Sequence, residues 1–387
     1  MAQAPPTFWG YRRADGTAGI RNHLVVIPSV VCANTVAQRV AALIPGAVAI
    51  PHPHGCAQVG DDVGLTERVL AGAAANPNVG AALIIGLGCE TCQASDVADL
   101  ARAQAPGRPV ESFYIQDAGG SIKAIARGVE VGKALLAQVA AQQREAVPLS
   151  ELILATKCGN LDASSIVAAN PTLGVVADAL VDGGGTVLLG ETPDLAGAAH
   201  VLVRRARDGR VATRLGDLLA KVDPREGPAG QEGHAAGGVG GASTPEETSL
   251  GCAAKAGTRP IQDVLAFAAR PRGAGVFVMD TPAHDAVAVS AMAAGGAQLC
   301  VFTTGRGTPL GNAICPVIKV CGNAATVGQM ADNVDLSTAP LTEGLADREE
   351  LAAQLLQLVI DVCNGRLTSA EIIGHQEFAI HRVGPTV

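Results

Sequence analysis

Aromatic side chains are scarce in this sequence of 387 residues, which contains one Trp, two Tyr and six Phe. Any hydrophobic core must therefore be built mainly from Ala, Val, Leu and Ile. Charged residues make up 17% and hydrophobic residues 48%, a balance that excludes an intrinsically disordered chain. The 47 glycines suit an α/β fold with tight turns between strands and helices.

Basic clusters and long apolar runs are lacking as well. The formal net charge is −8 and the only basic run is the short stretch Arg204–Arg210, so nucleic acid is not expected as a partner. No apolar run reaches the roughly 20 residues that span a bilayer, and the N-terminus has no apolar segment of the signal-peptide kind. We therefore expect a cytoplasmic protein that binds no membrane.

Nucleotide-binding signatures are missing too. The string nearest to a phosphate-binding P-loop, GVEVGK at residues 128–133, lacks the required spacing and lies within an expected helix. No GxGxxG motif follows an expected strand. The sequence gives no support for nucleotide binding.

What the sequence does contain is a series of short apolar runs separated by helical stretches. Runs that are apolar throughout are typical of parallel strands covered on both faces. The chain is also longer than one hydrophobic core usually grows. We predict an α/β fold of two domains with mainly parallel sheets, the second domain a Rossmann-like variant. The expected strands are residues 24–30, 47–51, 81–87, 110–115, 152–156, 186–189, 275–280, 299–303 and 317–320.

Two segments set the expected domain organisation. The longest expected helix is Ser121–Glu145, which Pro148 ends. A boundary at residue 148 gives an N-terminal α/β domain, 1–148, and a C-terminal catalytic domain, 149–387. The stretch 225–259 is too rich in glycine to predict a regular element, and it is expected to be a surface linker or a mobile loop over a site.

Ten cysteines occur in a chain without an export signal, so we expect reduced thiols used for metal binding or catalysis and not a disulfide framework. Several of them will be plain core residues. Cys89 and Cys92 form a CxxC pair, which suits a zinc half-site or a redox dithiol, but no second CxxC accompanies it. A structural role for Cys92 is equally open.

Polar residues cluster directly after the expected strands, where α/β sheets carry their ligands. Six strand ends carry residues that can bind a metal ion or transfer a proton. The formation of turns alone would not require such residues at so many strand ends. Structural alternatives stay open, since His54 also suits a surface loop, and Glu191 and Asp280 also suit caps of the next helices. These strand-end residues are His52, His54, Cys56, Cys89, Glu90, Cys92, Lys157, Cys158, Asp162, Glu191, Asp194, Asp280, His284 and Arg306.

Motifs along nearly the whole chain resemble, in order, the large segment of the altronate and galactarate dehydratases. They are GYRRADGTAGIRN (10–22), HPHGC (52–56), GLGCE (86–90), KCGNLDASSIVAANPTLGVVAD (157–178), GETPDLAG (190–197), SLGCAAKAGT (249–258), MDTPA (279–283), FTTGRGTPLGN (302–312) and PVIKVCGN (316–323). The sequence departs from this pattern at Asn160 and Leu161, where members that act on sugar acids have Gly and Ser. This departure suits a shorter or less hydroxylated acid.

The resemblance implies a lyase that removes the proton on carbon 2 of a 2-hydroxy acid and expels the group on carbon 3. The first expectation is loss of water from an altronate- or galactarate-type acid to give a 2-keto-3-deoxy acid. The alternative is a (2R)-3-sulfolactate sulfo-lyase large subunit, which gives pyruvate and sulfite. The resemblance also implies one Fe(II) or Mn(II) ion, because a divalent metal that chelates the substrate can stabilise the enediolate.

Residue roles follow from the same resemblance. Base candidates are His52 and Lys255, and Arg306, between Gly305 and Gly307, is the expected clamp on the substrate carboxylate. The expected metal ligands are Cys158, Asp162, Glu191 and Asp280, and further site candidates are Cys56, Cys89 and Glu90. Two other classes stay open: an iron–sulfur hydro-lyase that uses Cys56, Cys89 and Cys158, and a non-catalytic binding or scaffold subunit.

Partners are also implied by the resemblance. Single-chain dehydratases of the family carry an extra β-rich domain before the segment that resembles residues 10–22, and here nine residues precede that segment. We therefore expect a separate small β-rich subunit of the SAF type, with about 100 residues. A homodimer of the large subunit is also expected.

Overall fold

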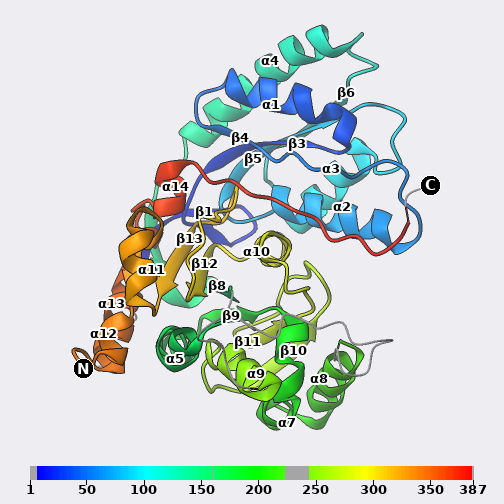
Figure 1. Cartoon of the computed structure of the whole chain (residues 1–387). Coiled ribbons are helices and arrows are strands. Elements are labelled where there is room, and N and C mark those ends of the chain that lie inside the picture. Colours follow the sequence, from blue (N-terminus) through cyan, green and yellow to red (C-terminus); the bar gives the residue numbers. More distant parts are fainter. Residues whose placement is uncertain (1–6, 160, 223–243, 386–387) are drawn as a thin grey trace.

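The computed structural model describes residues 7–159, 161–222 and 244–385. Its strands form a four-stranded parallel sheet, a seven-stranded parallel sheet and a small antiparallel sheet (Figure 1). The predicted α/β class with mainly parallel sheets is confirmed.

The strands are β1 (Thr7–Arg12), β2 (Ala18–Gly19), β3 (His23–Pro28), β4 (Ala47–Ala49), β5 (Val79–Gly86), β6 (Val110–Tyr114), β7 (Glu145–Pro148), β8 (Ile153–Cys158), β9 (Thr186–Leu189), β10 (Ile261–Leu265), β11 (Gly275–Met279), β12 (Leu299–Thr304), β13 (Val317–Cys321) and β14 (Leu336–Ser337). The α-helices are α1 (Asn34–Ala42), α2 (Asp61–Ala74), α3 (Ala94–Gln104), α4 (Ser121–Ala140), α5 (Asn170–Asp182), α6 (Thr192–Leu195), α7 (Ala199–Leu202), α8 (Gly209–Lys221), α9 (Pro245–Ala254), α10 (Asp285–Ala294), α11 (Ala324–Gln329), α12 (Ala339–Thr342), α13 (Arg348–Cys363) and α14 (Ser369–Ile373).

The four-stranded sheet has the order β4-β3-β5-β6 and is covered on both faces. Leu24 and Val26 of β3 point into a core formed with α1 and α4, whereas Val25 and Ile27 point into a core formed with α2 and α3. All eight residues of β5 are buried, as expected for a strand with a helical layer on each face.

The seven-stranded sheet has the order β10-β11-β9-β8-β12-β13-β14, with all neighbours parallel. From β8 the chain moves to β9 on one side, and it later returns to the other side of β8 with β12. The carboxyl ends of β8 and β12 therefore form a topological switch point, where open α/β sheets place their ligands. Helices α2, α3 and α10 share one core with this sheet and the smaller one, so they lie between the two sheets (Figure 1).

The expected helix Ser121–Glu145 is wrong at its C-terminal end. Helix α4 ends at Ala140, and residues Glu145–Pro148 form β7, which pairs antiparallel with β1. Val147 lies opposite Phe8 and both side chains are buried, so pairing with a distant strand replaces the last helical turn. Sequence periodicity near residue 145 contains no information about that partner.

Part of the stretch 225–259 is also corrected. Residues 223–243 lie outside the described residues, but Pro245–Ala254 form helix α9 and not a loop. A capping box starts this helix, because Thr244 accepts from the Glu247 amide and the Glu247 carboxylate accepts from the Thr244 amide. Its internal Gly251 packs against Ile166, where a Cβ would lie 2.6 Å from the Ile166 side chain.

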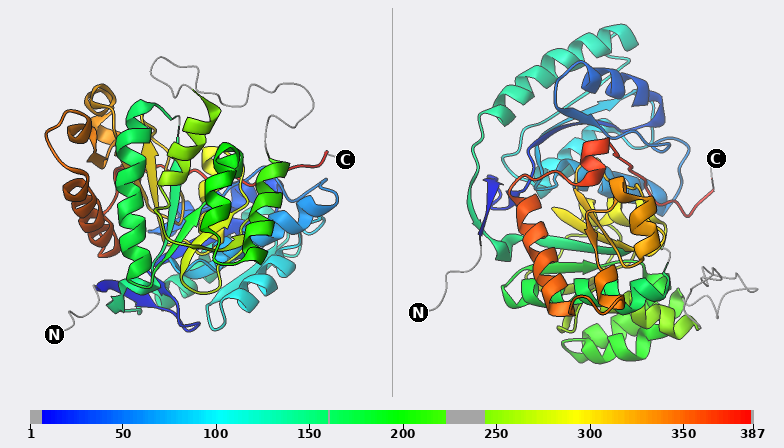
Figure 2. Two further views of the ribbon diagram at one scale, coloured as in Figure 1. Left: turned by 90° about the horizontal axis from the view of Figure 1, so that it is seen from below. Right: turned by 60° about the vertical axis from the view of Figure 1, so that its left-hand side comes forward.

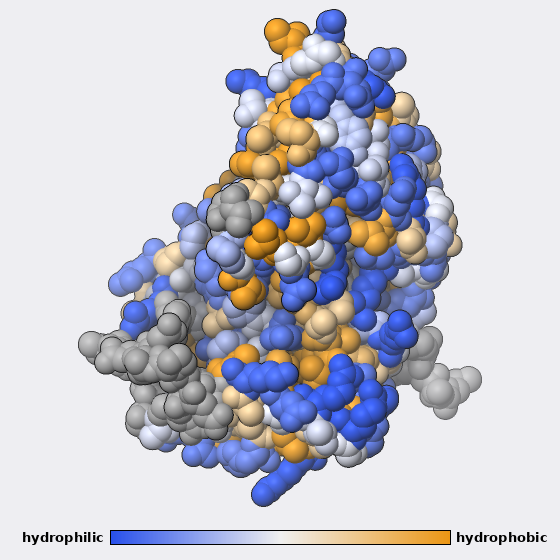
Figure 3. Space-filling model, turned by 90° about the vertical axis from the view of Figure 1, so that its right-hand side faces the viewer, coloured by the Kyte–Doolittle hydropathy of each residue, from blue (hydrophilic) through white to orange (hydrophobic). Residues whose placement is uncertain are grey.

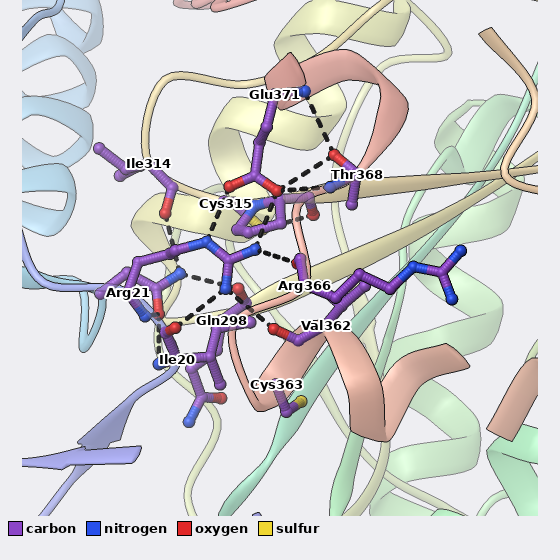
Figure 4. Close-up of polar contacts among 12 residues, drawn as sticks. Ile20, Arg21, Gln298, Ile314, Cys315, Val362, Cys363, Arg366, Thr368 and Glu371 are labelled. Carbon is purple, nitrogen blue, oxygen red and sulfur yellow. Dashed lines mark hydrogen bonds and ion pairs between the residues drawn. The ribbon is translucent and has the colours of Figure 1, made fainter. Parts of the chain in front are cut away.

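The C-terminal part of the chain ties the two sheets together. Arg21, just before β3, makes a bidentate ion pair with Glu371 of α14 and donates to the carbonyls of Val362 and Arg366 (Figure 4). Beyond α14 the chain runs along the smaller sheet's layer toward α2 (Figures 1 and 2). There the amides of Val383 and Gly384 donate to Asp62 at the start of α2.

One helical segment of the described residues, Ser165–Asp182, is long and apolar enough to cross a membrane by length and composition. In the fold 56% of it is buried, and Leu173, Val176 and Leu180 pack in the core of the large sheet. The segment is therefore accounted for as a core helix. The face shown in Figure 3 carries several separate hydrophobic patches among hydrophilic residues.

Candidate functional site

A buried group of ionisable side chains lies at the carboxyl edge of the large sheet. Lys157 and Cys158 end β8, Glu191 follows β9, and Cys252 and Lys255 come from the end of α9. All five side chains are buried, with exposed fractions of 3% or less. These five residues are called the Lys–Glu–Cys group below.

The Lys255 ammonium lies at the centre of this group. Its Nζ is 2.7 Å from Glu191 Oε2, 3.0 Å from Cys158 Sγ and 2.8 Å from Cys252 Sγ. The two sulfur atoms are 3.3 Å apart. One cation therefore contacts the carboxylate and both thiols at hydrogen-bond distance.

Lys157 extends the group toward solvent. Its Nζ contacts Glu191 Oε1 and lies 2.7 Å from Asp285 Oδ1, at the start of α10. Asp285 is 40% exposed, so it is the member of the chain of contacts that water reaches. Two ammonium groups and two carboxylates add to zero net charge, which lets the charges stay ionised inside the protein.

The pKa directions agree with this pairing. Burial opposes ionisation of Glu191, but Lys157 and Lys255 outweigh it and lower the pKa of that carboxyl. Burial also opposes the charge on Lys255, but Cys158, Cys252 and Glu191 hold its pKa well above the ordinary value. The hydrogen bond with Cys252 and burial raise the pKa of Cys158. The raised pKa keeps Lys255 protonated at neutral pH.

The backbone holds Glu191 in a conformation that few residues adopt. Its φ of 65° is left-handed, a region that is unfavourable for a residue with a Cβ. The Glu191 amide donates to Thr281 Oγ1 at 2.7 Å, and its carboxylate accepts from the Cys158 amide at 3.0 Å. Strain of this kind is concentrated at functional sites.

Asp162 lies at the switch point but outside the Lys–Glu–Cys group. Its carboxylate accepts from the Ser164 hydroxyl at 2.7 Å, from the Ser165 amide and hydroxyl at 2.8 and 2.9 Å, and from Asn323 at 3.3 Å. Burial opposes ionisation, but these hydrogen bonds outweigh it and lower the pKa of Asp162. Gly305 borders the same carboxylate so closely that a Cβ would lie 2.1 Å from it.

The other residues expected in this domain lie apart from one another. Asp280 accepts from the Thr192 hydroxyl at 3.1 Å. Arg306 is exposed and makes no ion pair within the described part of the chain. Of the four expected metal ligands, the structure brings Cys158 and Glu191 together and leaves Asp162 and Asp280 outside their group.

The remaining expected residues lie at the carboxyl edge of the small sheet. His52 Nε2 donates to the Pro28 carbonyl at 2.7 Å, and its Nδ1 accepts from the His54 amide at 3.2 Å, so both ring nitrogens are engaged. Burial lowers the pKa of His52 to about 4. Glu90 is buried and accepts from Ser29 and from the amides of residues 87 and 88, whereas Cys56 and Cys89 are exposed.

A metal ion can be tested against the donors present. Within the described residues, the group of His, Cys, Asp and Glu whose donor atoms all lie within 4.8 Å of one another is Cys158, Glu191 and Cys252. By donor type such a set could hold a metal ion of the iron or zinc kind. The Lys255 ammonium occupies the space between these donors, so the set does not fit a divalent ion while that lysine keeps its proton.

Sequence reasoning missed three members of this arrangement. Lys157 is named from the sequence only as a strand-end residue without a role, and Cys252 and Asp285 are not singled out. The spacing of Cys252 and Lys255, three residues apart, places both on one face of a helix. From the sequence, residues 225–259 are expected to be a linker or loop, so this helical spacing is not used.

Comparisons with known proteins agree along the whole chain. Residues 10–140 match the second domain of D-galactarate dehydratase/altronate hydrolase, and residues 149–386 match the C-terminal domain of D-galactarate/altronate dehydratase. The (2R)-sulfolactate sulfo-lyase subunit beta of Chromohalobacter salexigens is 37% identical over 97% of both chains. The altronate dehydratase of Bacillus subtilis is 33% identical over 98% of this chain, and that of Escherichia coli is 32% identical over 97% of this chain. In both cases the match covers 78% of the dehydratase.

Proposed function

The chain belongs to the D-galactarate/altronate dehydratase family of lyases, and on that premise we propose that it eliminates the β-substituent of a 2-hydroxy acid. The observation that carries the proposal is the end-to-end similarity to a sulfolactate sulfo-lyase subunit. We take (2R)-3-sulfolactate as the first substrate, with pyruvate and sulfite as products. Leu161 in place of a small polar residue supports a less hydroxylated acid.

Dehydration of altronate or galactarate is the second candidate, and it was the first expectation from the sequence. The similarity of nearly this whole chain to 78% of each of two altronate dehydratases supports it. Both reactions share removal of the carbon-2 proton and differ in the leaving group. Water leaves with a proton from an acid, whereas sulfite leaves as an anion and needs positive charge nearby.

The Lys–Glu–Cys group supplies positive charge of this kind. Asp285 is the exposed partner of Lys157, so a substrate carboxylate that replaces Asp285 would meet the Lys157 ammonium. Lys255, expected from the sequence as a base candidate, is proposed here as an acid or a fixed cation because its pKa is raised. Glu191 keeps both lysines charged and in place.

Two further roles complete the proposal. Arg306 is proposed to clamp the substrate carboxylate from the exposed loop after β12. A bound Fe(II) or Mn(II) ion would contribute Lewis-acid stabilisation of the enediolate. No step is assigned to a metal within the Lys–Glu–Cys group, because Lys255 occupies its centre.

The test is a substrate panel of 3-sulfolactate, altronate and galactarate with reduced protein supplied with Fe(II) or Mn(II), scoring 2-oxo acid and sulfite separately. Equal amounts of pyruvate and sulfite are expected from 3-sulfolactate. Lys157→Met should lower turnover by at least about tenfold, while Lys133→Met on the exposed face of α4 should not. A 2-keto-3-deoxy acid from altronate would select the second candidate, and no product from any acid would overturn the proposal.

We also propose a small β-rich partner subunit. The similar sulfo-lyase chain is named subunit beta, which makes it one part of a multi-subunit enzyme. Co-purification from the native host, followed by mass spectrometry, should recover a second chain. Full activity of this chain alone, at a native mass made up only of its own copies, would contradict the partner.

A further inference from the structure

The ten cysteines divide sharply by exposure. All are free thiols; seven are buried, and Cys32, Cys56 and Cys89 are exposed. These three follow β3, β4 and β5, which are neighbours in the order β4-β3-β5. Because the strands are parallel, their carboxyl ends meet at one edge of the sheet. The exposed thiols therefore belong to three loops at the same edge.

Hydrogen bonds join the three loops directly. The Val31 amide donates to the His54 carbonyl at 2.8 Å, and the Gly55 carbonyl accepts from the amides of Thr91 and Cys92 at 3.1 Å each. Each of these bonds lies within three residues of an exposed cysteine. Gly55 permits the close approach, because a Cβ there would lie 2.1 Å from the Ser29 carbonyl oxygen. These backbone hydrogen bonds therefore hold together the three loops that carry the exposed cysteines.

A single ion does not fit these three thiols as they stand. Cys32, Cys56 and Cys89 all lie within the described chain, yet they are not a set whose donor atoms fall within 4.8 Å of one another. A single tetrahedral ion would require its thiolates to be that close. An iron–sulfur cluster binds each thiolate through a different iron, so it accepts ligands that stand farther apart.

A second feature at this edge is an unused lone pair. His54 Nε2 donates to the Ile380 carbonyl at 3.1 Å, which leaves Nδ1 of the neutral ring without a proton. That Nδ1 is buried and has no hydrogen-bond partner among the described residues, and the residue is 8% exposed. Buried polar atoms are seldom left without a partner. His54 is two residues from Cys56, so this unpartnered atom belongs to the loop that carries one of the exposed thiols.

We propose that Cys32, Cys56 and Cys89 bind a four-iron iron–sulfur cluster through three thiolates, leaving one iron with an open coordination position. Each thiol loses its proton and forms one bond to iron, and the cluster assembles from about equal amounts of Fe(II) and Fe(III) together with sulfide from solution, so no protein group is oxidised or reduced. Cys32 takes the place of Cys158 in the trio considered from the sequence. Cys158 is buried on the other sheet, in contact with Cys252 and Lys255.

The open iron gives the cluster a chemical role. An iron that lacks a fourth protein ligand can bind the carboxylate and hydroxyl oxygens of a hydroxy acid as a Lewis acid. This role rests on the proposed function, whereas the three-thiolate site does not. The two claims therefore need separate measurements.

The site is tested by anaerobic reconstitution of the full chain with Fe(II), Fe(III) and sulfide, followed by iron and sulfide analysis, visible absorption and electron paramagnetic resonance of the reduced protein. We expect about four irons and about four sulfides per chain, with a broad visible band. Cys32→Ser, Cys56→Ser and Cys89→Ser should each lower bound iron several-fold. Because all three side chains are exposed, circular dichroism should show an unchanged fold.

Cys252→Ser is the matched control and should keep the iron and the sulfide. Iron without sulfide in the wild type, or loss of iron in Cys252→Ser but not in Cys89→Ser, would overturn the cluster. A cluster that forms as expected in a chain that converts none of the three acids would leave the site standing and would refute the proposed elimination.

Discussion

Lys255 Nζ lies 2.7 Å from Glu191 Oε2, and neither side chain has exposed surface. A buried ion pair contributes little net stability, but removal of one partner leaves the other charge without compensation. Glu191 contacts both ammonium groups, since Lys157 Nζ contacts its other oxygen, while Asp285 is a second partner of Lys157 only. Glu191 is therefore the residue on which this part of the core depends most.

Glu191→Gln should destabilise the protein by about 3–5 kcal/mol, because the buried Lys255 ammonium loses its carboxylate partner and Lys157 keeps only the half-exposed Asp285. Urea unfolding measures the change. Asp182→Asn removes a carboxylate from an exposed pair with Arg259 and should have little effect. Adding Lys255→Met to Glu191→Gln should recover part of the loss. An unchanged unfolding midpoint in Glu191→Gln would show that the network is not ionised.

Lys255→Ala should open the Lys–Glu–Cys group to a divalent ion. Without the ammonium, Cys158, Cys252 and Glu191 keep three donors within 4.8 Å of one another. Titration with Co(II) should then show thiolate-to-metal absorption and an affinity at least about tenfold above that of the wild type. Adding Cys252→Ser should remove the absorption. Equal Co(II) binding by wild type and Lys255→Ala would mean that the lysine does not block the site.

Stability should fall as the pH drops from about 6.5 to about 4, partly through His52. Its pKa is lowered from 6.5 to about 4 by burial, so the unfolded chain takes up a proton before the folded chain does. The contribution is complete above pH 6.5 and is lost as the pH falls through the folded pKa. At 1.36 kcal/mol per pKa unit it amounts to about 3 kcal/mol.

The check is the slope of unfolding free energy against pH between these values. His52→Gln should reduce the slope by about one proton, while His200→Gln, at a half-exposed histidine, should leave it unchanged. Desolvation lowers the pKa of the partly buried His23 to about 4 and also lowers the pKa of His54, so these two residues should supply part of the slope that remains. A His52→Gln slope equal to that of the wild type would exclude the neutral buried imidazole.

Gly305→Ala should disrupt the switch point. An added Cβ would lie 2.1 Å from the Asp162 carboxyl, which is held by four hydrogen bonds, so that side chain would be displaced. We expect a loss of about 1–3 kcal/mol in thermal unfolding and a marked loss of turnover. Gly64→Ala in α2 meets no atom within 4 Å and should be neutral or mildly stabilising. Normal activity of Gly305→Ala would remove Asp162 from consideration as a site residue.

Most strands of the two parallel sheets could be predicted from the sequence because they are short, apolar runs. The predicted runs do not include β10, whose Gln262 and Asp263 are polar, or β14, which has two residues. Thr186–Leu189 is a strand with the predicted bounds, and the other predicted runs differ from the observed strands by a few residues. Strand β7 could not be predicted, since its only stabilising partner is β1 at the other end of the first 148 residues. Local periodicity cannot report a pairing across that separation.

The site was predictable by residue type but not by grouping. Cys158, Glu191 and Lys255 were all named from strand ends and motifs, yet nothing in the sequence shows that a lysine lies between a carboxylate and two thiols. Likewise, Asp162 and Glu191 follow neighbouring strands, but Asp162 is held by the start of its own helix. Capping hydrogen bonds and ion pairs compete for the same carboxylates, and only the tertiary structure decides between them.

The hydrogen bond from His54 to the Ile380 carbonyl joins residues 326 positions apart. A ribosome that has made the small sheet must still synthesise the whole large sheet and α14 before Ile380 emerges. The histidine beside the exposed thiols therefore acquires its final orientation only near the end of synthesis. Any cofactor delivered to these thiols on the nascent chain would meet an incompletely formed site, so its insertion belongs after translation.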